Sequence, residues 1–196
     1  MRKAKLILAF LFTLVVPLFT YAAPQEFEID KTHTSIMFSV SHFGFSKVIG
    51  RFNDFSGNYT FDDANMVSGK VDLTINTTSI DTGMDKRDEH LRSPDFFDVE
   101  KFPTMTFTST KVKKIGKNSA KVTGDLTLLG VTKPVTLDVK FNKLGEYPMP
   151  QYKGIPVAGF SVHGKIKRSD FGMKTFLGPI GDEIELMIET EGHGKK

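Results

Sequence analysis

The most constraining feature of this sequence is a period-two alternation of apolar and polar residues that runs from residue 27 almost to the end. Successive side chains of a β-strand point to opposite faces of a sheet, so the pattern predicts strands with one buried and one solvated face. Ile36, Phe38 and Val40 show it, and so does the run from Val67 to Ile75. Helical periodicity is nearly absent, so we predict an all-β chain.

Roughly eight strands follow from this pattern. One is predicted from Val48 to Phe61, and later ones lie within residues 104–116, 119–130, 133–145, 157–168 and 182–192. Between residues 128 and 135 the segment GVTKP is typical of a tight connection, so the strands on either side are predicted to form an antiparallel hairpin. The segment 144–156 contains three prolines and two glycines, and we expect a surface loop there, at a rim or as a lid.

Eight consecutive antiparallel strands with one apolar face can form a sandwich or close into a barrel, and alternation alone does not distinguish the two. Glycine within a strand marks a sharp bend or a close approach to the backbone. Such glycines recur at Gly50, Gly57, Gly69, Gly124, Gly159 and Gly164. We therefore favour a curved, eight-stranded antiparallel barrel with one short helix in a long connection.

The N-terminus has the features of a secretory signal peptide. Arg2, Lys3 and Lys5 precede an apolar run from Leu6 to Phe19, and small residues follow. That run of 14 residues is short of the roughly 20 needed to span a bilayer. We expect export, cleavage after residue 22, and a single domain over residues 23–196.

Removal of the signal peptide changes the charge balance. It takes three of the 26 basic residues and none of the 23 acidic ones, so the mature chain carries 23 of each. A neutral chain without a block of Lys and Arg gives no reason to expect a nucleic-acid partner. The sequence contains no cysteine, which excludes disulfides, thiolate metal sites and a cysteine nucleophile.

The most highly charged segment is DKRDEHLRSPDFFDVEKFP, from Asp85 to Pro103. Thr82, three residues before Asp85, forms an approximate capping box, and residues 85–92 suit a short helix that Pro94 prevents from continuing. Asp88 and Arg92 are spaced to pair across one turn. We predict a solvated helix anchored by Met84 and Leu91, because Glu89 and His90 point in different directions and do not form a metal-ligand pair.

No enzyme signature is present. The remaining histidines are scattered, and no GxSxG, HExxH or phosphate-binding glycine loop occurs. His42 is in register with Val40 and is interpreted as an inward, hydrogen-bonded residue rather than a ligand or base. We therefore expect no catalysis, no metal and no cofactor. Fifteen phenylalanines remain in the mature chain, enough either to fill a barrel or to line a ligand cavity.

Several long motifs resemble one known family. KRDEHLRSPDFFD, TFTSTKVKK, VTGDLTLLGVTKPVTLDV and GKIKRSDFGMK, with FEIDKTHTSIMFSVSH before them and IGDEIELMIETEG after them, are similar to the YceI-like polyisoprenoid-binding family. The resemblance covers essentially the whole mature chain. It implies a periplasmic, lipocalin-like barrel that holds a long isoprenoid lipid, such as a polyprenyl phosphate or a quinone-type molecule, for carriage, storage or protection. It also implies that Phe96 and Phe97 fold back as anchors beside the short helix.

Within that resemblance, candidate ligand-binding residues are selected by size and by position on or near strands. The wall candidates are Phe38, Val40, Phe52, Phe107, Phe160, Phe171 and Phe176. The candidates for polar contacts with a phosphate or quinone oxygen near a mouth are His42, Arg87, Arg92 and Lys174.

Three other functions stay open from the sequence: a less specific carrier of fatty acids or amides, an enzyme that modifies a lipid headgroup, and a purely structural or partner-binding barrel. Transient contact with a membrane surface or with membrane proteins is compatible with a lipid ligand. The sequence does not predict the oligomeric state.

Overall fold

The computed structural model describes residues 24–150 and 153–195. Within them lie eleven strands: β1 (Gln25–Ile29), β2 (Ser35–His42), β3 (Ser46–Phe52), β4 (Phe55–Phe61), β5 (Lys70–Asn76), β6 (Ile80–Asp81), β7 (Thr104–Lys114), β8 (Ser119–Leu128), β9 (Val131–Glu146), β10 (Pro156–Lys167) and β11 (Ile180–Gly194). The α-helix, α1 (Asp85–Arg92), lies between β6 and β7. Short 3-10 turns are η1 (Met66–Ser68), η2 (Thr77–Ser79) and η4 (Arg168–Phe171).

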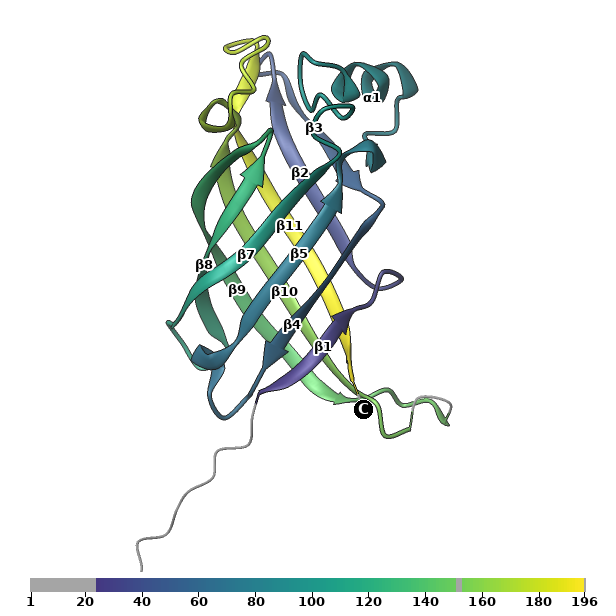
Figure 1. Cartoon of the computed structure of the whole chain (residues 1–196), viewed down its shortest axis with the longest axis vertical. Coiled ribbons are helices and arrows are strands. Elements are labelled where there is room, and N and C mark those ends of the chain that lie inside the picture. The colour runs from purple at the N-terminus through teal and green to yellow at the C-terminus, as the bar shows by residue number, and fades with distance from the viewer. Residues whose placement is uncertain (1–23, 151–152, 196) are drawn as a thin grey trace, which may run out of the picture.

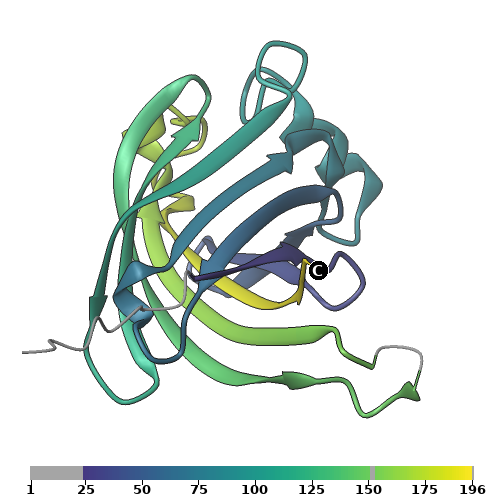
Figure 2. The ribbon, with the colours of Figure 1, turned by 60° about the horizontal axis from the view of Figure 1, so that its bottom comes forward.

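Eight of these strands close a barrel. The antiparallel circuit runs β1, β4, β5, β7, β8, β9, β10, β11, and β11 pairs back to β1. Figure 1 shows the strands inclined around a common axis with α1 at the upper end, and Figure 2 shows the ring of strands with the ends of β9 and β10 projecting from it. The prediction of an eight-stranded antiparallel barrel with a short helix in a long connection is confirmed.

Strand β11 pairs with β10 along one edge and with two strands in succession along the other. Its residues 192–194 pair with β1, and residues 180–189 pair with β2. The chain crosses from one partner to the other through residues 30–34, between the two strands. β3 pairs with β2, and β6 pairs with β3, so three strands extend the barrel wall at the end that carries α1.

The predicted single strand from Val48 to Phe61 is wrong. The structure has two strands there, β3 and β4, because the chain changes partners: β3 pairs with β2, whereas β4 pairs with β1 and β5. Asn53 and Asp54 form the break, and the backbone N–H of Asn76 donates to the carbonyl oxygen of Asp54 at 2.9 Å. Phe52 and Phe55 are both buried on either side, so the apolar pattern conceals the turn.

The predicted hairpin at residues 119–141 is confirmed, with Val122 opposite Leu137. Its turn at Leu129 and Gly130 has φ values of +53° and +72°, as a two-residue hairpin turn of the primed type requires. The alternation predicted from Val67 onward is wrong at its beginning, because Met66–Ser68 form η1 and Val67 is 52% exposed.

Helix α1 forms at the predicted residues but with different contacts. Asp88 is buried, and its Oδ1 accepts hydrogen bonds from the backbone N–H and the hydroxyl of Thr82 at 2.9 and 2.5 Å. Arg92 instead donates to the carbonyl oxygens of Thr78 and Ile80. The predicted Asp88–Arg92 pair and the predicted capping by Thr82 are therefore wrong. The buried Asp88 carboxylate instead accepts hydrogen bonds from Thr82, the donor nearest to it.

The segment after α1 packs against the barrel. Phe96 is buried, and the Phe97 ring contacts Phe52 edge to face at 5.6 Å, so the predicted anchoring by these two residues is confirmed. Leu91 also packs against the core, whereas Met84 is 52% exposed and anchors nothing.

The connection between β9 and β10 lies at the lower end of the barrel in Figure 1, near the C-terminus and opposite α1. β9 continues to Glu146 and β10 begins at Pro156, so the connection is shorter than the predicted loop. The expected signal peptide, residues 1–22, lies outside the described residues. Among the described residues, no helix is long and apolar enough to cross a membrane.

Candidate functional site

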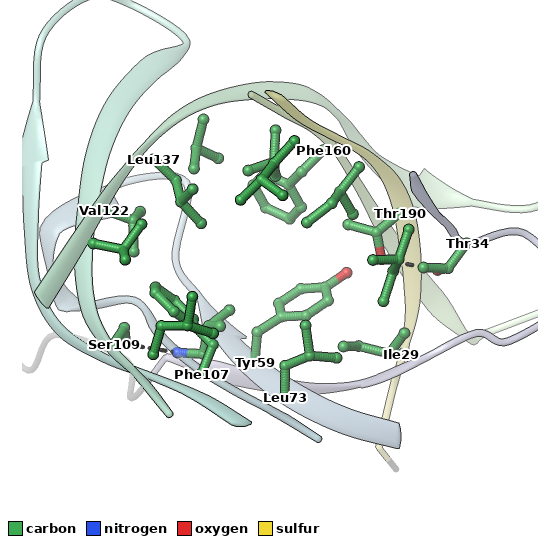
Figure 3. A pocket seen from close by; sticks show the side chains of 18 of the residues that line it. Ile29, Thr34, Tyr59, Leu73, Phe107, Ser109, Val122, Leu137, Phe160 and Thr190 are labelled. Atoms are coloured by element: carbon green, nitrogen blue, oxygen red, sulfur yellow. Dashed lines mark hydrogen bonds between the residues drawn. The ribbon is translucent and has the colours of Figure 1, made fainter. Parts of the chain in front are cut away.

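The inward faces of the barrel strands enclose an apolar cavity of about 220 Å³. Figure 3 shows Leu73, Phe107, Val122, Leu137 and Phe160 pointing into this space from different strands. Period-two alternation places these side chains inside because every second residue of each strand faces the lumen. We call this space the interior cavity.

Several of the few polar side chains on the wall of the interior cavity bond to other protein groups. The hydroxyl groups of Thr34 and Thr190 are 2.9 Å apart, and the hydroxyl of Ser109 accepts a hydrogen bond from the backbone N–H of Val71 at 2.8 Å. Polar groups that are already paired present little affinity for a polar ligand. The interior cavity therefore suits a hydrocarbon.

Aromatic rings pack around one end of this cavity. Tyr59 stacks on Phe27 at 5.3 Å and meets Phe160 edge to face at 5.4 Å. The Tyr59 hydroxyl donates to the carbonyl oxygen of Ala158 at 2.6 Å. Burial, followed by the negative charge of Glu191, raises the pKa of Tyr59 far above that of a free phenol, so the ring stays neutral.

A second cavity of about 340 Å³ lies at the α1 end, and we call it the upper cavity. Phe38 lines both cavities, so they adjoin at its ring. The described residues that line the upper cavity include Arg87, His42 and His90 but no carboxylate. Most of its lining is apolar, as in the interior cavity, but it also contains an arginine and two histidines, which the lining of the interior cavity lacks.

Arg87 is held in place by α1 and the residues before it. Its Nε donates to the Thr82 hydroxyl at 2.6 Å, and its Nη2 donates to the Thr82 carbonyl oxygen at 2.8 Å. The same threonine donates to the buried Asp88, so a connected network orients the guanidinium at the wall of the upper cavity. A guanidinium is suited to phosphate, carboxylate or carbonyl oxygens.

The structure distributes the candidate binding residues over the two cavities. Phe52, Phe107 and Phe160 line the interior cavity with Phe38. The upper cavity is lined by Val40, His42, Arg87 and Phe176. His42 is exposed at the end of β2 and contacts the Phe43 ring edge to face at 4.7 Å, so the predicted inward, hydrogen-bonded position is wrong.

Three other candidates lie outside the described linings. The guanidinium of Arg92 donates hydrogen bonds to the backbone carbonyl groups of Thr78 and Ile80. Phe171 is 2% exposed within η4 and belongs to the packed core. Lys174 is exposed on the loop that follows. Their types are suitable for a lipid site, but strand alternation gave no information about these non-strand positions.

Sequence reasoning missed other residues of both linings. In the upper cavity these are Phe43, His90 and Phe96, which come from turns and from the helical connection. In the interior cavity they are mainly the aliphatic residues Val122, Leu126, Leu137, Leu186 and Ile188. The alternation identified the strands that carry the second group, but selection by size favoured phenylalanine.

A separate cluster of ionisable side chains joins the β1–β2 crossing to β11. The ligand atoms of Asp30, His33 and Glu191 lie within 4.8 Å of one another, and such a set resembles that of divalent-metal sites. His33 Nδ1 lies 2.5 Å from Asp30 Oδ2, and the Tyr147 hydroxyl donates to Glu191. Asp30 and His33 bind each other, and the backbone N–H of Asp30 donates to the carbonyl oxygen of Glu191 at 2.9 Å, so we interpret the cluster as a clasp that holds the crossing against β11.

These features define a class of protein: a closed antiparallel barrel whose apolar lumen, and a second cavity with a few basic side chains beside it, are suited to a lipid-like ligand. Residues 27–192 match the family described as the YceI-like domain. A protein named YceI from Escherichia coli O6:H1 is 48% identical over 177 residues, covering 89% of this chain and 90% of that protein. The chain belongs to the YceI-like family, so the resemblance in its motifs is confirmed.

Solved structures show the same fold. BcnA of Burkholderia cenocepacia superimposes with a TM-score of 0.75 at 25% identity, covering 83% of this chain and 98% of BcnA. A domain of Saccharophagus degradans, described as polyisoprenoid-binding and implicated in plant cell wall breakdown, superimposes with a TM-score of 0.64 at 17% identity, covering 86% and 98%.

Proposed function

We propose that this protein binds one long isoprenoid-type lipid, with the hydrocarbon chain in the interior cavity and the polar end in the upper cavity. The observation that carries the proposal is that Phe38 lines two cavities with mostly apolar walls, of which only the upper one also has Arg87 and two histidines in its lining. A ligand with an apolar tail and a polar end matches this arrangement.

The energetics support a long chain. Each CH2 group removed from water contributes about 0.8 kcal/mol of transfer free energy, so an apolar wall alone gives a long chain ample gross affinity. The interior cavity, at about 220 Å³, exceeds the roughly 150 Å³ of an apolar cavity that accommodates benzene. Membership of the YceI-like family and the polyisoprenoid-binding description of the Saccharophagus degradans domain favour isoprenoids over other chains.

The polar end is proposed to bear an oxygen acceptor, such as a phosphate or a quinone carbonyl, that accepts from Arg87. We further propose a role in carriage, storage or protection of the lipid in the periplasm, after removal of residues 1–22, and no catalysis. The basic, apolar and small-residue order of that segment supports export.

The deciding experiment is extraction and mass spectrometry of the lipid bound to protein purified from the periplasm of its own host, combined with native mass spectrometry of the complex. We expect one isoprenoid-type species at about one per chain. Reproducibly lipid-free protein would overturn the proposal. Equal competition by isoprenoids and fatty acids or amides of similar length would favour a general lipid carrier.

A matched pair of variants locates the ligand. Val122→Phe adds bulk to the wall of the interior cavity, whereas Lys121→Phe adds the same side chain on the outer face of the same strand. We expect the Val122 variant to retain less lipid and the Lys121 variant to retain as much as the original protein. Equal loss from both would place the lipid outside the barrel.

A further inference from the structure

We propose that the upper end of the barrel docks onto an anionic lipid bilayer through four exposed side chains, Phe43, Phe45, Phe176 and Leu177. These four are called the aromatic rim. They lie on two segments, the turn between β2 and β3 and the loop between η4 and β11. This inference deepens the proposed function, because it names the surface from which a lipid ligand enters the barrel.

The first observation is the degree of exposure. Phe45 is 92% exposed, and Phe43 and Phe176 are each 57% exposed. Apolar side chains exposed singly are ordinary, but a group of large ones on neighbouring segments marks an interaction surface. The two segments are neighbours, because the backbone N–H of Phe43 donates to the carbonyl oxygen of Pro179 at 2.7 Å.

The second observation is that the backbone fixes this exposure. Phe43 and Phe176 have left-handed φ values of +52° and +54°, a conformation that costs a non-glycine residue about 1 kcal/mol or more. The N–H of Ile180 donates to the carbonyl oxygen of Phe176 at 2.9 Å. The buried Arg168 guanidinium binds the carbonyl oxygens of Met173 and other residues around the same loop. The backbone of the loop that carries Phe176 is therefore held firmly in place.

The third observation is charge. The segments HFGFSK (42–47) and GMKTFLGPI (172–180) contain Lys47 and Lys174 but no acidic residue. Lys47 is paired with Glu185 of β11, so the exposed Lys174 supplies the positive charge beside the rim. A basic side chain near an anionic membrane surface contributes about 1 kcal/mol of attraction. Apolar side chains flanked by basic ones are the combination that binds the interface of an anionic bilayer.

The fourth observation is continuity with the ligand site. Phe43 and Phe176 line the upper cavity while more than half of each is exposed, so the aromatic rim borders the opening of that cavity. A lipid that leaves a bilayer at this position reaches the apolar interior without crossing bulk water. This relation favours a bilayer over a protein as the surface that covers the rim.

The test uses the absence of tryptophan from the chain, which makes a single introduced tryptophan an unambiguous fluorescence probe. Phe45→Trp places it on the rim. Ile115→Trp is the matched control, because Ile115 is 52% exposed in the β7–β8 turn at the opposite end. Each variant is titrated with vesicles of phosphatidylglycerol and phosphatidylethanolamine, and with neutral phosphatidylcholine vesicles.

We expect a blue shift of the Phe45→Trp emission with the anionic vesicles, a weaker shift with the neutral ones, and none for Ile115→Trp. Phe45→Glu, a change at a nearly fully exposed position, is expected to weaken vesicle co-sedimentation about tenfold while leaving the amount of co-purified lipid unchanged. Equal spectra for the two tryptophan variants, or rim-dependent dimers in solution without vesicle binding, would overturn the proposal.

The outcomes separate this proposal from the proposed function. Lipid recovered from the purified protein without any vesicle-dependent shift would leave the ligand site intact and remove the docking surface. A blue shift in protein that never carries lipid would support docking and overturn lipid binding.

Discussion

Gly50 on β3 pairs with Phe38 on β2, and the Phe38 ring occupies the space where a β-carbon at position 50 would lie. The glycine thus allows the ring to lie flat across the neighbouring strand. Because Phe38 lines both cavities, its position affects the shape of each.

Gly50→Ala is expected to displace the Phe38 ring, to reduce the free energy of unfolding by about 1–3 kcal/mol, and to lower the fraction of protein that retains lipid. Gly116→Ala is the matched control, because the nearest atom to an added β-carbon there is 3.6 Å away. Urea unfolding and extraction of bound lipid measure the two effects. A Gly50 variant that behaves like the Gly116 variant would show that the ring moves freely.

Arg168 makes more hydrogen bonds than Asp88, the other buried charged residue of the described part of the chain. It is 3% exposed and donates to the carbonyl oxygens of Met173, Thr175, Ile180 and Gly181. Burial lowers the pKa of this guanidinium, and the nearby charge of Asp182 opposes only part of that shift.

Arg168→Met leaves these carbonyl groups without their donor, so we expect a loss of about 3 kcal/mol or more in the free energy of unfolding. Arg168→Lys is expected to recover only part, because an ammonium lacks the planar fork. Lys167→Met, at the exposed neighbouring position, is the control and is expected to be nearly neutral. Thermal and urea unfolding measure the stability of the three variants. Equal stability of the two methionine variants would contradict a stabilising role of the Arg168 hydrogen bonds.

Much of the barrel can be predicted from the sequence because a lumen imposes a period of two. The hairpin of β8 and β9 follows directly, since Val122 and Leu137 face the same interior. The break between β3 and β4 does not, because the chain changes strand partners without interrupting the run of apolar residues.

The upper cavity is less predictable, because its walls come from turns and a helix rather than from one periodic element. Asp88 resembles any surface acid of a charged helix, yet it is buried and bonded to Thr82. Arg168 and Arg92 likewise bind backbone carbonyl groups of segments distant in sequence. Only the folded arrangement distinguishes these side chains from Arg87, which lines a cavity.

Tyr59 predicts a specific response to alkaline pH. Burial raises the pKa of its phenol above the ordinary value of 10.0. Above that pH the unfolded chain releases this proton while the folded chain keeps it, so the free energy of unfolding falls as the pH rises. Tyr59→Phe is expected to cost about 1–3 kcal/mol at neutral pH, through the unpaired Ala158 carbonyl, and to weaken the alkaline dependence. Urea unfolding at several pH values measures both.

The clasp at the β1–β2 crossing is testable by NMR. The hydrogen bond with Asp30 raises the pKa of His33, and the pKa of Asp30 is lowered because the hydrogen bonds from His33 and Thr32 outweigh the opposing effect of burial. Asp30→Asn is expected to return the pKa of His33 toward 6.5, whereas Asp54→Asn, a carboxylate paired with Lys31 instead, is expected to leave it raised.

The raised pKa of His33 determines how the free energy of unfolding changes with pH. The stabilisation from the Asp30–His33 pair is fully present below the unfolded value of 6.5 and is lost as the pH rises through the higher folded value. The stability difference between the original protein and Asp30→Asn is therefore expected to shrink at alkaline pH. A constant difference would contradict protonation of His33 as its source.

The double pairing of β11 has a consequence for how the protein folds. Its residues 180–194 are nearly the last of the chain, yet they bond to β1 and β2, which are among the first described. Contacts so distant in sequence carry a high loop-closure entropy and slow the folding of β proteins. A nascent chain cannot seal the barrel until its final strand is available, and until then the unpaired edges of β1, β2 and β10 are exposed to aggregation and proteolysis.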